Sequence, residues 1–347
     1  MTSRSRIIIG VIVFCAASSI LVNSCRKSDA GRRTTPLSFT VPDGFPQPVY
    51  DFSTNPSTEE GFQLGKKLFY DSRLASHNDV SCGSCHQQLA AYTTFDHDLG
   101  HGTNHQHTTR NVPGIFNMVW QKEFEWDGRV NNLEQQMITC ITAPEKMGMT
   151  VETVINKIDT VAEYKTMFNA AFGDGTITGE RIAKALTQFV GMIVSANSTY
   201  DKMKRGEASF NSSQLAGYEL FKSHCTSCHT EPLFTDFTYR NIGLPHRNFH
   251  EDAGRMRVTG SASDSLKFKV PSLRNVGITS YYAHDGRFAG ITEVLDHYTS
   301  GIVSTPTLDP LLQSPMQLTN LEKFYIMEFL FTLNDSAMVA DRRFSAD

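Results

Sequence analysis

The sequence predicts a mostly α-helical protein, with two similar units in tandem and long loops around them. Apolar residues such as Ile182, Leu186 and Phe189 recur at spacings of three or four, which is typical of a helix with one buried face. No convincing run of alternating polar and apolar residues predicts a sheet. A five-residue pattern, C-x-x-C-H, occurs at residues 82–86 and again at residues 225–229, which indicates the tandem arrangement.

Each unit begins with an expected helix. The segments Gly65–Phe69 and Gly217–Phe221 share the pattern G-x-x-L-F and lie shortly before the two C-x-x-C-H patterns. We expect the apolar face of each helix to lie against the group that C-x-x-C-H holds. Residues 71–130 and 230–315 are rich in Gly, Pro, His and Asn, which predicts long loops. Thr319, with a glutamate three residues later, predicts the capped start of a last helix.

The pattern C-x-x-C-H is the attachment signature of a c-type haem. Two thioether bonds fix the porphyrin to the cysteines, and the histidine is an axial ligand of the iron. A dithiol redox motif or a disulfide leaves the histidines unexplained, and a structural zinc site needs the two pairs close together in sequence. We therefore predict two covalently bound haem c groups in two cytochrome-c-like domains. The predicted haem-binding residues are Cys82, Cys85, His86, Cys225, Cys228 and His229.

The N-terminus has the features of a lipoprotein-type signal peptide over residues 1–25. Arg4 adds positive charge, residues 7–22 are mostly apolar, and residues 21–25 resemble a bacterial lipobox that ends at Cys25. We expect a lipid anchor at Cys25 and a periplasmic location, outside the cytoplasm, where c-type haem is attached. An ordinary cleaved signal and an uncleaved anchor are the alternatives.

Composition suggests how the mature chain is divided. Residues 26–54 are polar or rich in Pro, Gly and Ser, which predicts a flexible tether. We expect an N-terminal haem domain over residues 55–205 and a C-terminal haem domain over residues 206–347. The formal charge of −4 gives no basic field, so nucleic acid is not an expected partner. Cys140 lies outside the haem patterns, and we interpret it as a small buried apolar residue.

Four further segments carry a family resemblance. They read T-R-N-x-P at 109–113, W-D-G-R at 126–129, F-K-V-P-S-L-R-N-V at 268–276 and Y-Y-A-H-D-G at 281–286. With the two haem patterns, they make the chain resemble the bacterial di-haem cytochrome c peroxidases, a family that includes the tryptophylquinone-maturing enzyme MauG, over residues 55–335. The resemblance implies that the haems face each other across an interface, with the N-terminal haem reacting with peroxide and the C-terminal haem receiving electrons.

For the N-terminal haem, the resemblance implies that His101 is a distal iron ligand that is displaced on activation. Three neighbouring histidines compete for this role. Trp126 corresponds to the family's tryptophan between the haems, which could relay electrons or hold a radical. The alternative for Trp126 is a large buried ring with a bonded indole N–H. The competing histidines are His97, His105 and His107.

Peroxide chemistry needs a base for the first proton and a donor to the departing oxygen. The resemblance implies that Gln136 is the distal glutamine. The distal glutamate should follow ten residues later, but Lys146 occupies that position, and a protonated lysine cannot accept a proton. We expect Glu145 to serve as the carboxylate instead; otherwise the protein is a slow or altered peroxidase.

For the C-terminal haem, the resemblance implies His229 as the proximal ligand. It places Tyr298 where many peroxidases of the family have a methionine ligand. The tryptophylquinone-maturing branch has a tyrosine at this position. Phenolate ligation would lower the reduction potential relative to methionine. Met316 and His297 are the alternative ligands.

The resemblance also implies a calcium ion between the domains. Its ligands would be the side chain of Asn111 and the backbone carbonyls of Thr279 and Tyr281, and such oxygen ligands suit a hard cation. The implied activity is reduction of hydrogen peroxide to water, with electrons from a small soluble cytochrome c or cupredoxin. The alternatives are a MauG-like oxidase acting on a protein or aromatic substrate, and a non-enzymatic di-haem electron carrier. A homodimer is a further expectation, because relatives often dimerise.

Overall fold

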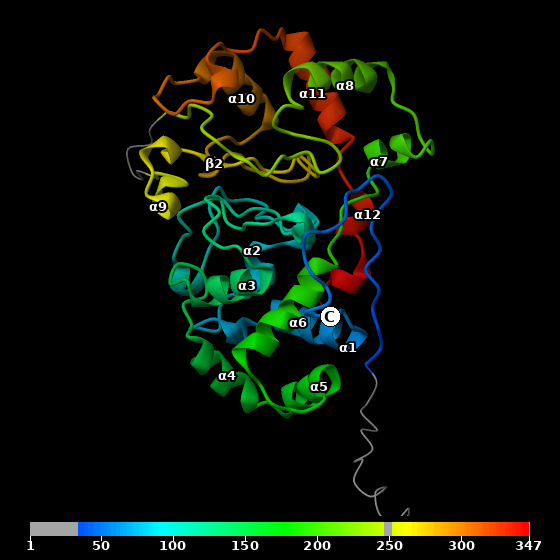
Figure 1. Ribbon diagram of the computed structural model, residues 1–347, viewed down its shortest axis with the longest axis vertical. Coiled ribbons are helices and arrows are strands. Elements are labelled where there is room, and N and C mark those ends of the chain that lie inside the picture. The colour runs from blue at the N-terminus through cyan, green and yellow to red at the C-terminus, as the bar shows by residue number, and fades with distance from the viewer. Residues whose placement is uncertain (1–33, 246–251, 347) are drawn as a thin grey trace, which may run out of the picture. The chain divides into compact units, whose positions relative to one another are not determined.

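Figure 1 shows the computed structural model, which describes residues 34–245 and 252–346. These residues are mostly helical, and their one small sheet pairs β1 (Tyr239–Arg240) with β2 (Phe268–Lys269) in antiparallel fashion. The predicted mostly-α class is therefore confirmed. The expected signal peptide and the lipid attachment at Cys25 fall outside the described residues. Within the described ranges, no helix combines the length and the apolar character needed to cross a bilayer.

The first group of helices is built around α1 (Glu59–Tyr70) and α6 (Gly179–Gly191), which pack against each other. Gly65 of α1 permits this packing, because a Cβ atom there would lie 2.0 Å from the carbonyl oxygen of Ala185. The remaining helices of the group are α2 (Cys82–Cys85), α3 (Leu133–Thr142), α4 (Val151–Asp159) and α5 (Ala162–Phe172).

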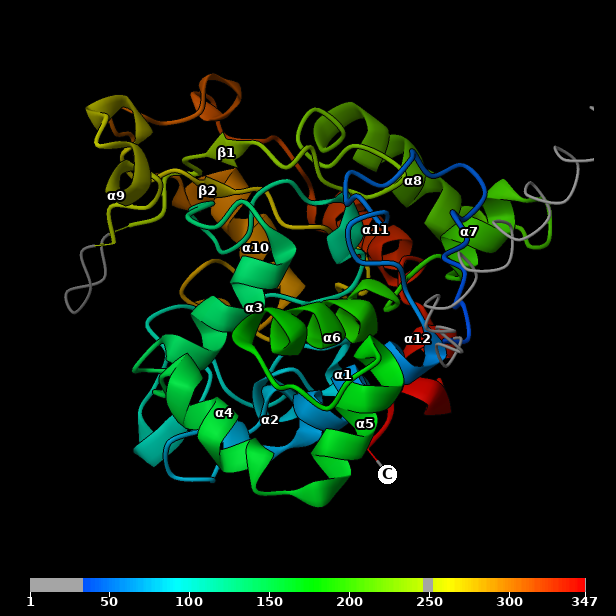
Figure 2. The same ribbon diagram turned by 60° about the horizontal axis from the view of Figure 1, so that its bottom comes forward.

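The second group repeats this arrangement with α8 (Ser212–His224) and α11 (Asn320–Phe331), which lie side by side (Figure 2). A Cβ atom on Gly217 would lie 1.8 Å from the carbonyl oxygen of Tyr325. The capping box predicted at Thr319 is present at the start of α11. The other helices in this part of the chain are α7 (Thr199–Lys204), α9 (Met256–Thr259) and α10 (Ile291–Asp296).

The G-x-x-L-F pattern shared by the two groups has a packing basis. In α1, the Phe69 ring lies 5.1 Å from the Phe189 ring of α6. In α8, the Phe221 ring lies 4.8 Å from the Phe329 ring of α11. In both groups the glycine admits the backbone of the neighbouring helix, and the phenylalanine four residues later packs on an aromatic side chain of that helix.

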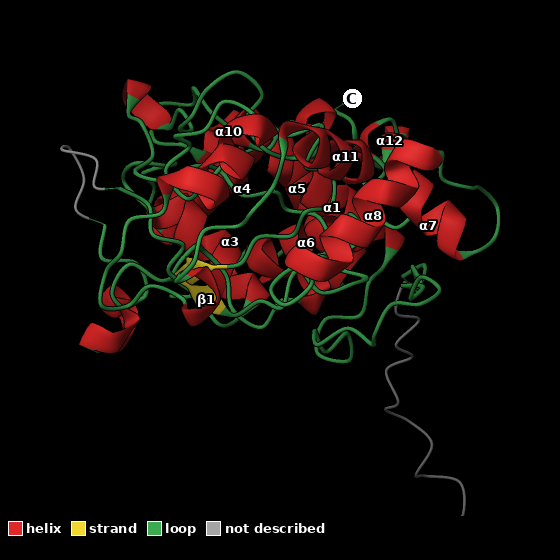
Figure 3. Ribbon diagram, turned by 90° about the horizontal axis from the view of Figure 1, so that it is seen from above, coloured by secondary structure: helices red, strands yellow, loops and turns green. Residues whose placement is uncertain are grey.

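Long irregular segments connect the helices, as the loops in Figure 3 show. They contain short turns of 3₁₀ helix and one π-helical turn, η6 (His297–Gly301). The 3₁₀ turns are η1 (Ser72–Leu74), η2 (Gln88–Ala90), η3 (Thr103–His105), η4 (Met118–Trp120), η5 (Ala262–Asp264), η7 (Pro310–Leu312) and η8 (Arg342–Phe344).

Residues 34–54 pack against the protein, which differs from the flexible tether expected there. The Phe39 and Phe45 rings lie 5.6 and 5.2 Å from the Trp120 ring, and the Trp120 indole N–H donates to the carbonyl of Pro46 over 2.8 Å. Aromatic side chains in this segment are therefore anchored on the loop that carries Trp120. The expected tether before residue 34 lies outside the described residues.

The C-terminal residues return to the first group of helices. After α12 (Ser336–Val339), the carbonyl of Phe344 accepts a hydrogen bond of 2.6 Å from the Tyr70 hydroxyl of α1. Met338 and Phe344 belong to the same buried apolar cluster as α1 and α6. A second buried cluster lies among α7, α8, α10 and α11. The domain boundary at residues 205 and 206 stays a prediction.

Candidate active site

Both C-x-x-C-H patterns open onto one cavity of about 530 Å³. The four cysteines are free thiols, and all four line this cavity together with the two histidines of the patterns. The disulfide alternative is therefore not the arrangement seen here. Thiols for thioether bonds and imidazoles for iron ligation thus face one shared space, so these residues fit two c-type haems.

Each motif histidine is oriented by a backbone carbonyl. Nδ1 of His86 is 2.8 Å from the carbonyl oxygen of Tyr92, and Nδ1 of His229 is 3.1 Å from that of Phe234. With Nδ1 donating, Nε2 is left to bind a metal, which is the usual outer-shell support of a histidine ligand. Burial lowers the pKa of His86 to about 4 and lowers that of His229, so both imidazoles are neutral and can act as ligands at neutral pH.

A group of three polar residues, Glu125, Gln136 and Lys146, lines the cavity. The Glu125 carboxylate accepts a hydrogen bond of 2.7 Å from Lys146 Nζ and one of 2.9 Å from Gln136 Nε2. Electrostatic interaction of Glu125 and Lys146 with His86 places the group near the first haem pattern. Gln136 was predicted for this site, whereas Glu125 was not.

Glu125 and Lys146 each stabilise the charged form of the other. Burial by itself raises the pKa of Glu125, but the ammonium group of Lys146 and the hydrogen bonds from Lys146 and Gln136 outweigh it, so the pKa falls to about 2. Burial by itself lowers the pKa of Lys146, but Cys140 and Glu125 raise it above its ordinary value. Both members are therefore charged at neutral pH.

Two other residues considered from the sequence also line the cavity. Glu145 lies on the wall, but its carboxylate forms no hydrogen bond within the described ranges. Cys140 lies on the wall as well, 3.2 Å from Gln136 Nε2, so it is not an apolar core residue as expected. The sequence offered one signal for Glu125, its place directly before Trp126 in the W-D-G-R segment.

Trp126 connects the two halves of the site. Its indole N–H donates to the carbonyl of Asn111 over 2.8 Å. Its own carbonyl accepts a hydrogen bond of 2.8 Å from the backbone N–H of Lys269, on β2. Trp126 thus lies on the cavity wall, held on one side by the first half of the chain and on the other by the second.

His101 is not among the residues that line the cavity. Its ring lies in an exposed cluster, 4.3 Å from the His97 ring and 4.5 Å from the His107 ring. The backbone carbonyl of His101 lies 3.4 Å from Cys85 Sγ of the first haem pattern. Its role as a displaced iron ligand stays a prediction, which this placement of the ring does not support.

On the His229 side, Tyr298 and Met316 both line the cavity. The backbone N–H of Met316 donates to the carbonyl of Tyr298 over 2.9 Å, so the two candidate ligands lie next to each other. Burial raises the pKa of the Tyr298 hydroxyl, and the neighbouring Cys225 adds to the effect. His297 Nε2 lies 2.8 Å from the carbonyl oxygen of Ile242, so this ring nitrogen is bonded to the backbone.

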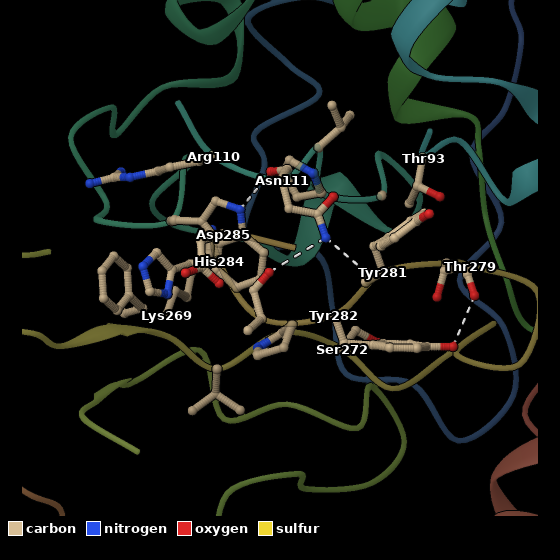
Figure 4. Close-up of a pocket in the computed structure, with 18 of the residues that line it drawn as sticks. Thr93, Arg110, Asn111, Lys269, Ser272, Thr279, Tyr281, Tyr282, His284 and Asp285 are labelled. Carbon is tan, nitrogen blue, oxygen red and sulfur yellow. Dashed lines mark hydrogen bonds between the residues drawn. The ribbon is translucent and has the colours of Figure 1, made fainter. Parts of the chain in front are cut away.

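The residues predicted to bind calcium lie together, as Figure 4 shows. Asn111 Nδ2 donates to the carbonyl of Tyr281 over 2.8 Å, while Asn111 Oδ1 is buried and has no hydrogen-bond partner in the described part of the chain. The carbonyl of Thr279 accepts a hydrogen bond of 2.9 Å from the Tyr282 hydroxyl. An orphaned side-chain oxygen beside backbone carbonyls suits a calcium ion, so the residues fit the ion.

The fold and the cavity define a class, that of helical proteins built to hold two c-type haems. A family model described as di-haem cytochrome c peroxidase matches residues 59–209. The chain is 31% identical over 310 residues to the methylamine utilization protein MauG of Methylophilus methylotrophus, covering 86% of this chain and 89% of that one. It is 33% identical over 249 residues to the cytochrome c551 peroxidase of Nitrosomonas europaea, covering 70% and 74%. The protein belongs to the di-haem cytochrome c peroxidase and MauG family, as the sequence predicted.

Solved structures agree with this assignment. A MauG-like protein associated with microbial copper homeostasis superposes with a TM-score of 0.79 at 30% identity, covering 89% of this chain and 99% of that one. The diheme peroxidase BthA from Burkholderia thailandensis has the same fold, with a TM-score of 0.72 at 21% identity over 89% of this chain and 95% of its own. The family carries two haem c groups, so the predicted cofactors are those of the family.

Proposed function

We propose that the protein reduces hydrogen peroxide to water at the His86 haem, with electrons that enter at the His229 haem. The supporting observation is the asymmetry of the cavity. Glu125, Gln136 and Lys146 form a polar group near His86. Tyr298 lies near the other haem pattern, where Cys225 and Cys228 interact with it electrostatically. One end is thus equipped for proton transfer and the other for a ligand to the iron.

When bound, the haems supply the iron that binds peroxide and the route for electrons. The chain supplies the rest. The Gln136 side chain, only 8% exposed, can hold the peroxide by hydrogen bonding, and charged neighbours can move its protons. Trp126, tied by hydrogen bonds to both halves, lies where an aromatic ring can shorten the electron path.

The proposal includes the setting of the enzyme. A lipid anchor at Cys25 would hold it at the periplasmic face of a membrane. Small soluble cytochromes c or cupredoxins would dock weakly and transiently, as redox partners do. A calcium ion at Asn111, Thr279 and Tyr281 would join the halves that these residues already bring together. Each half, divided near residue 205, would seat one haem.

The test uses the purified mature protein with its haems attached. Haem content is measured first, and reduced cytochrome c is then mixed with the protein in the presence and absence of hydrogen peroxide. The proposal expects two haems per chain and oxidation of two cytochromes for each peroxide consumed. A protein that holds two haems but leaves peroxide intact with every reduced cytochrome and cupredoxin tried would contradict it.

Tyr298 favours a second candidate, a MauG-like oxidase that removes electrons from a protein or an aromatic molecule. A phenolate ligand lowers the potential of its iron and so favours storage of oxidising equivalents. Peroxide added to the fully ferric protein without a donor distinguishes the two. A spectral change that persists for minutes supports the oxidase, and one that decays within seconds and is removed by reduced cytochrome c supports the peroxidase.

A further inference from the structure

We infer that Glu125, held by Lys146, is the proton acceptor of the peroxide pocket, in place of the carboxylate expected at position 145. The inference rests on the proposed function and assigns a catalytic role to a residue that lies outside the family motifs, directly before W-D-G-R. Glu125 comes from a loop, whereas Gln136 lies on α3 and Lys146 follows that helix.

Hydrogen bonds fix the carboxylate at the cavity wall. Glu125 is 11% exposed and Lys146 is 25% exposed, with 2.7 Å between Oε1 and Nζ. Gln136 Nε2 donates to the same Oε1 over 2.9 Å. The carboxylate therefore has a defined position on the surface that also includes Cys82, Cys85 and His86.

The backbone on both sides of Glu125 is held in place. Its φ is +65°, in the left-handed region that non-glycine residues rarely adopt. Phe124 is paired with Val130 across the loop, and the following Trp126 is bonded to Asn111. These contacts fix the loop from which the Glu125 side chain extends.

Gln136 supplies an independent observation. Its Oε1 is buried and has no hydrogen-bond partner among the described residues, although Nε2 is bonded to Glu125. A buried acceptor of this kind normally has a partner. An O–H group of peroxide next to the Glu125 carboxylate would satisfy it.

Lys146 keeps the Glu125 carboxylate in its ionised form. A carboxyl group in this cavity without a cation would be driven toward its protonated form by burial. The ammonium group at 2.7 Å holds Glu125 ionised, so it can take a proton. Lys146 thus acts through Glu125, as a positioning residue.

Glu125 carries one proton from the first oxygen of peroxide to the second. Glu125 takes the proton from one peroxide oxygen and returns it to the other as the O–O bond breaks, and that second oxygen leaves as water with the bonding electron pair. The first oxygen, from which Glu125 took the proton, accepts two electrons from the donor protein and two protons from solvent. It becomes the second water. Glu125 ends the cycle ionised, as it began.

The experiment measures two properties of the haem-loaded protein, kcat/KM for peroxide and the association rate of cyanide with the ferric form. Neutral HCN must lose its proton to bind as an anion, so its association reports a nearby base without any turnover. Glu125→Gln should lower both rates about 100-fold. Glu123→Gln is the matched control: Glu123 is two positions away, bonds Tyr239 and Arg255, is outside the cavity lining, and should leave both rates within about threefold.

A relocation variant separates catalysis from folding. Glu125→Gln combined with Lys146→Glu moves the carboxylate to position 146. Both rates of this double variant should be at least tenfold higher than those of Glu125→Gln alone. If Glu125→Gln leaves both rates within threefold, or if Glu145→Gln lowers them while Glu125→Gln does not, the inference is overturned. If the unaltered protein consumes no peroxide but its cyanide association still depends on Glu125, the proposed function fails and the inference stands.

Discussion

Lys146 Nζ lies 2.7 Å from Glu125 Oε1 on the wall of the cavity that the two haem patterns share. This pair reverses the charge expected along the sequence, because the position ten residues after Gln136 holds a cation and the carboxylate comes from a loop before α3. The pocket therefore still contains a carboxylate, that of Glu125. It accepts a hydrogen bond from Lys146, which occupies the position where the glutamate was expected.

The pair predicts a pH dependence. With Lys146 present, the pKa of Glu125 is about 2, so the ionised form persists well below neutral pH. Lys146→Met leaves burial as the main influence, which raises the pKa. The acid limb of kcat/KM for peroxide should therefore move upward, with activity lost at a higher pH than in the unaltered protein.

The measurement is a pH profile of both proteins with the same reduced cytochrome. The other groups that act on Glu125 are Gln136, Arg129, Cys140, Lys269 and His86, and the substitution leaves them in place. An acid limb at the same pH in both proteins would show that Glu125 does not govern the profile.

Tyr298 predicts a low potential for the second haem. Tyr298→Met should raise the midpoint potential of the His229 haem, because a thioether ligand favours ferrous iron more than a phenolate does. A redox titration followed by absorption measures the shift. An unchanged potential in Tyr298→Met, together with a changed one in Met316→Leu, would assign the ligand to Met316.

The glycine at the crossing of α1 and α6 predicts a loss of stability. A Cβ at Gly65 would lie 2.0 Å from the carbonyl oxygen of Ala185, so Gly65→Ala should lower the free energy of unfolding by about 1–3 kcal/mol. The gain in helix propensity, up to about 1 kcal/mol, is too small to offset this overlap. Urea unfolding followed by circular dichroism gives the difference.

Gly290 provides the matched control. A Cβ atom there meets no atom of the described residues within 4 Å, so Gly290→Ala should cost less than about 1 kcal/mol, mainly because alanine is a poorer N-cap of α10 than glycine. Equal effects of the two substitutions would mean that the close approach of α1 and α6 is not required for stability.

Arg274 gives a prediction about the F-K-V-P-S-L-R-N-V segment. Its guanidinium group is fully buried and makes hydrogen bonds of 2.9 and 2.8 Å to the two carboxylate oxygens of Asp201. Asp201→Asn leaves a buried cation without its counter-charge and should cost about 3 kcal/mol of unfolding free energy. Asp174→Asn, at a pair whose carboxylate is 57% exposed, should cost clearly less than Asp201→Asn. Similar costs in the two variants would contradict the structural role of Arg274.

Much of the site could be predicted because covalent chemistry ties it to short patterns. C-x-x-C-H requires adjacent residues, so Cys82, Cys85 and His86 could be recognised in sequence, and the structure places them on one cavity wall. Gln136 could be located by its distance from Trp126. Glu125 could not, because it meets Lys146 through the folding of a loop, and nothing in the spacing along the chain records that approach.

The fold was predictable in the same uneven way. Helices with one apolar face and the paired G-x-x-L-F segments could be read from periodicity, although only the structure explains the pattern by the contacts of Gly65 and Gly217. Residues 34–54 were predicted to be part of a tether because the segment is polar or rich in Pro, Gly and Ser, and this composition does not show where Phe39 and Phe45 pack. They are held by the Trp120 ring, which lies far away in sequence.

In the proposed reaction, peroxide is reduced at the His86 haem with electrons passed from the His229 haem. The most direct measurement is peroxide-dependent oxidation of reduced cytochrome c by the unaltered protein and by His86→Ala, with absorption spectra of both. We expect rapid oxidation by the unaltered protein, and loss of that activity in His86→Ala while the spectrum of the second haem is kept. Retained activity in His86→Ala would contradict the proposal.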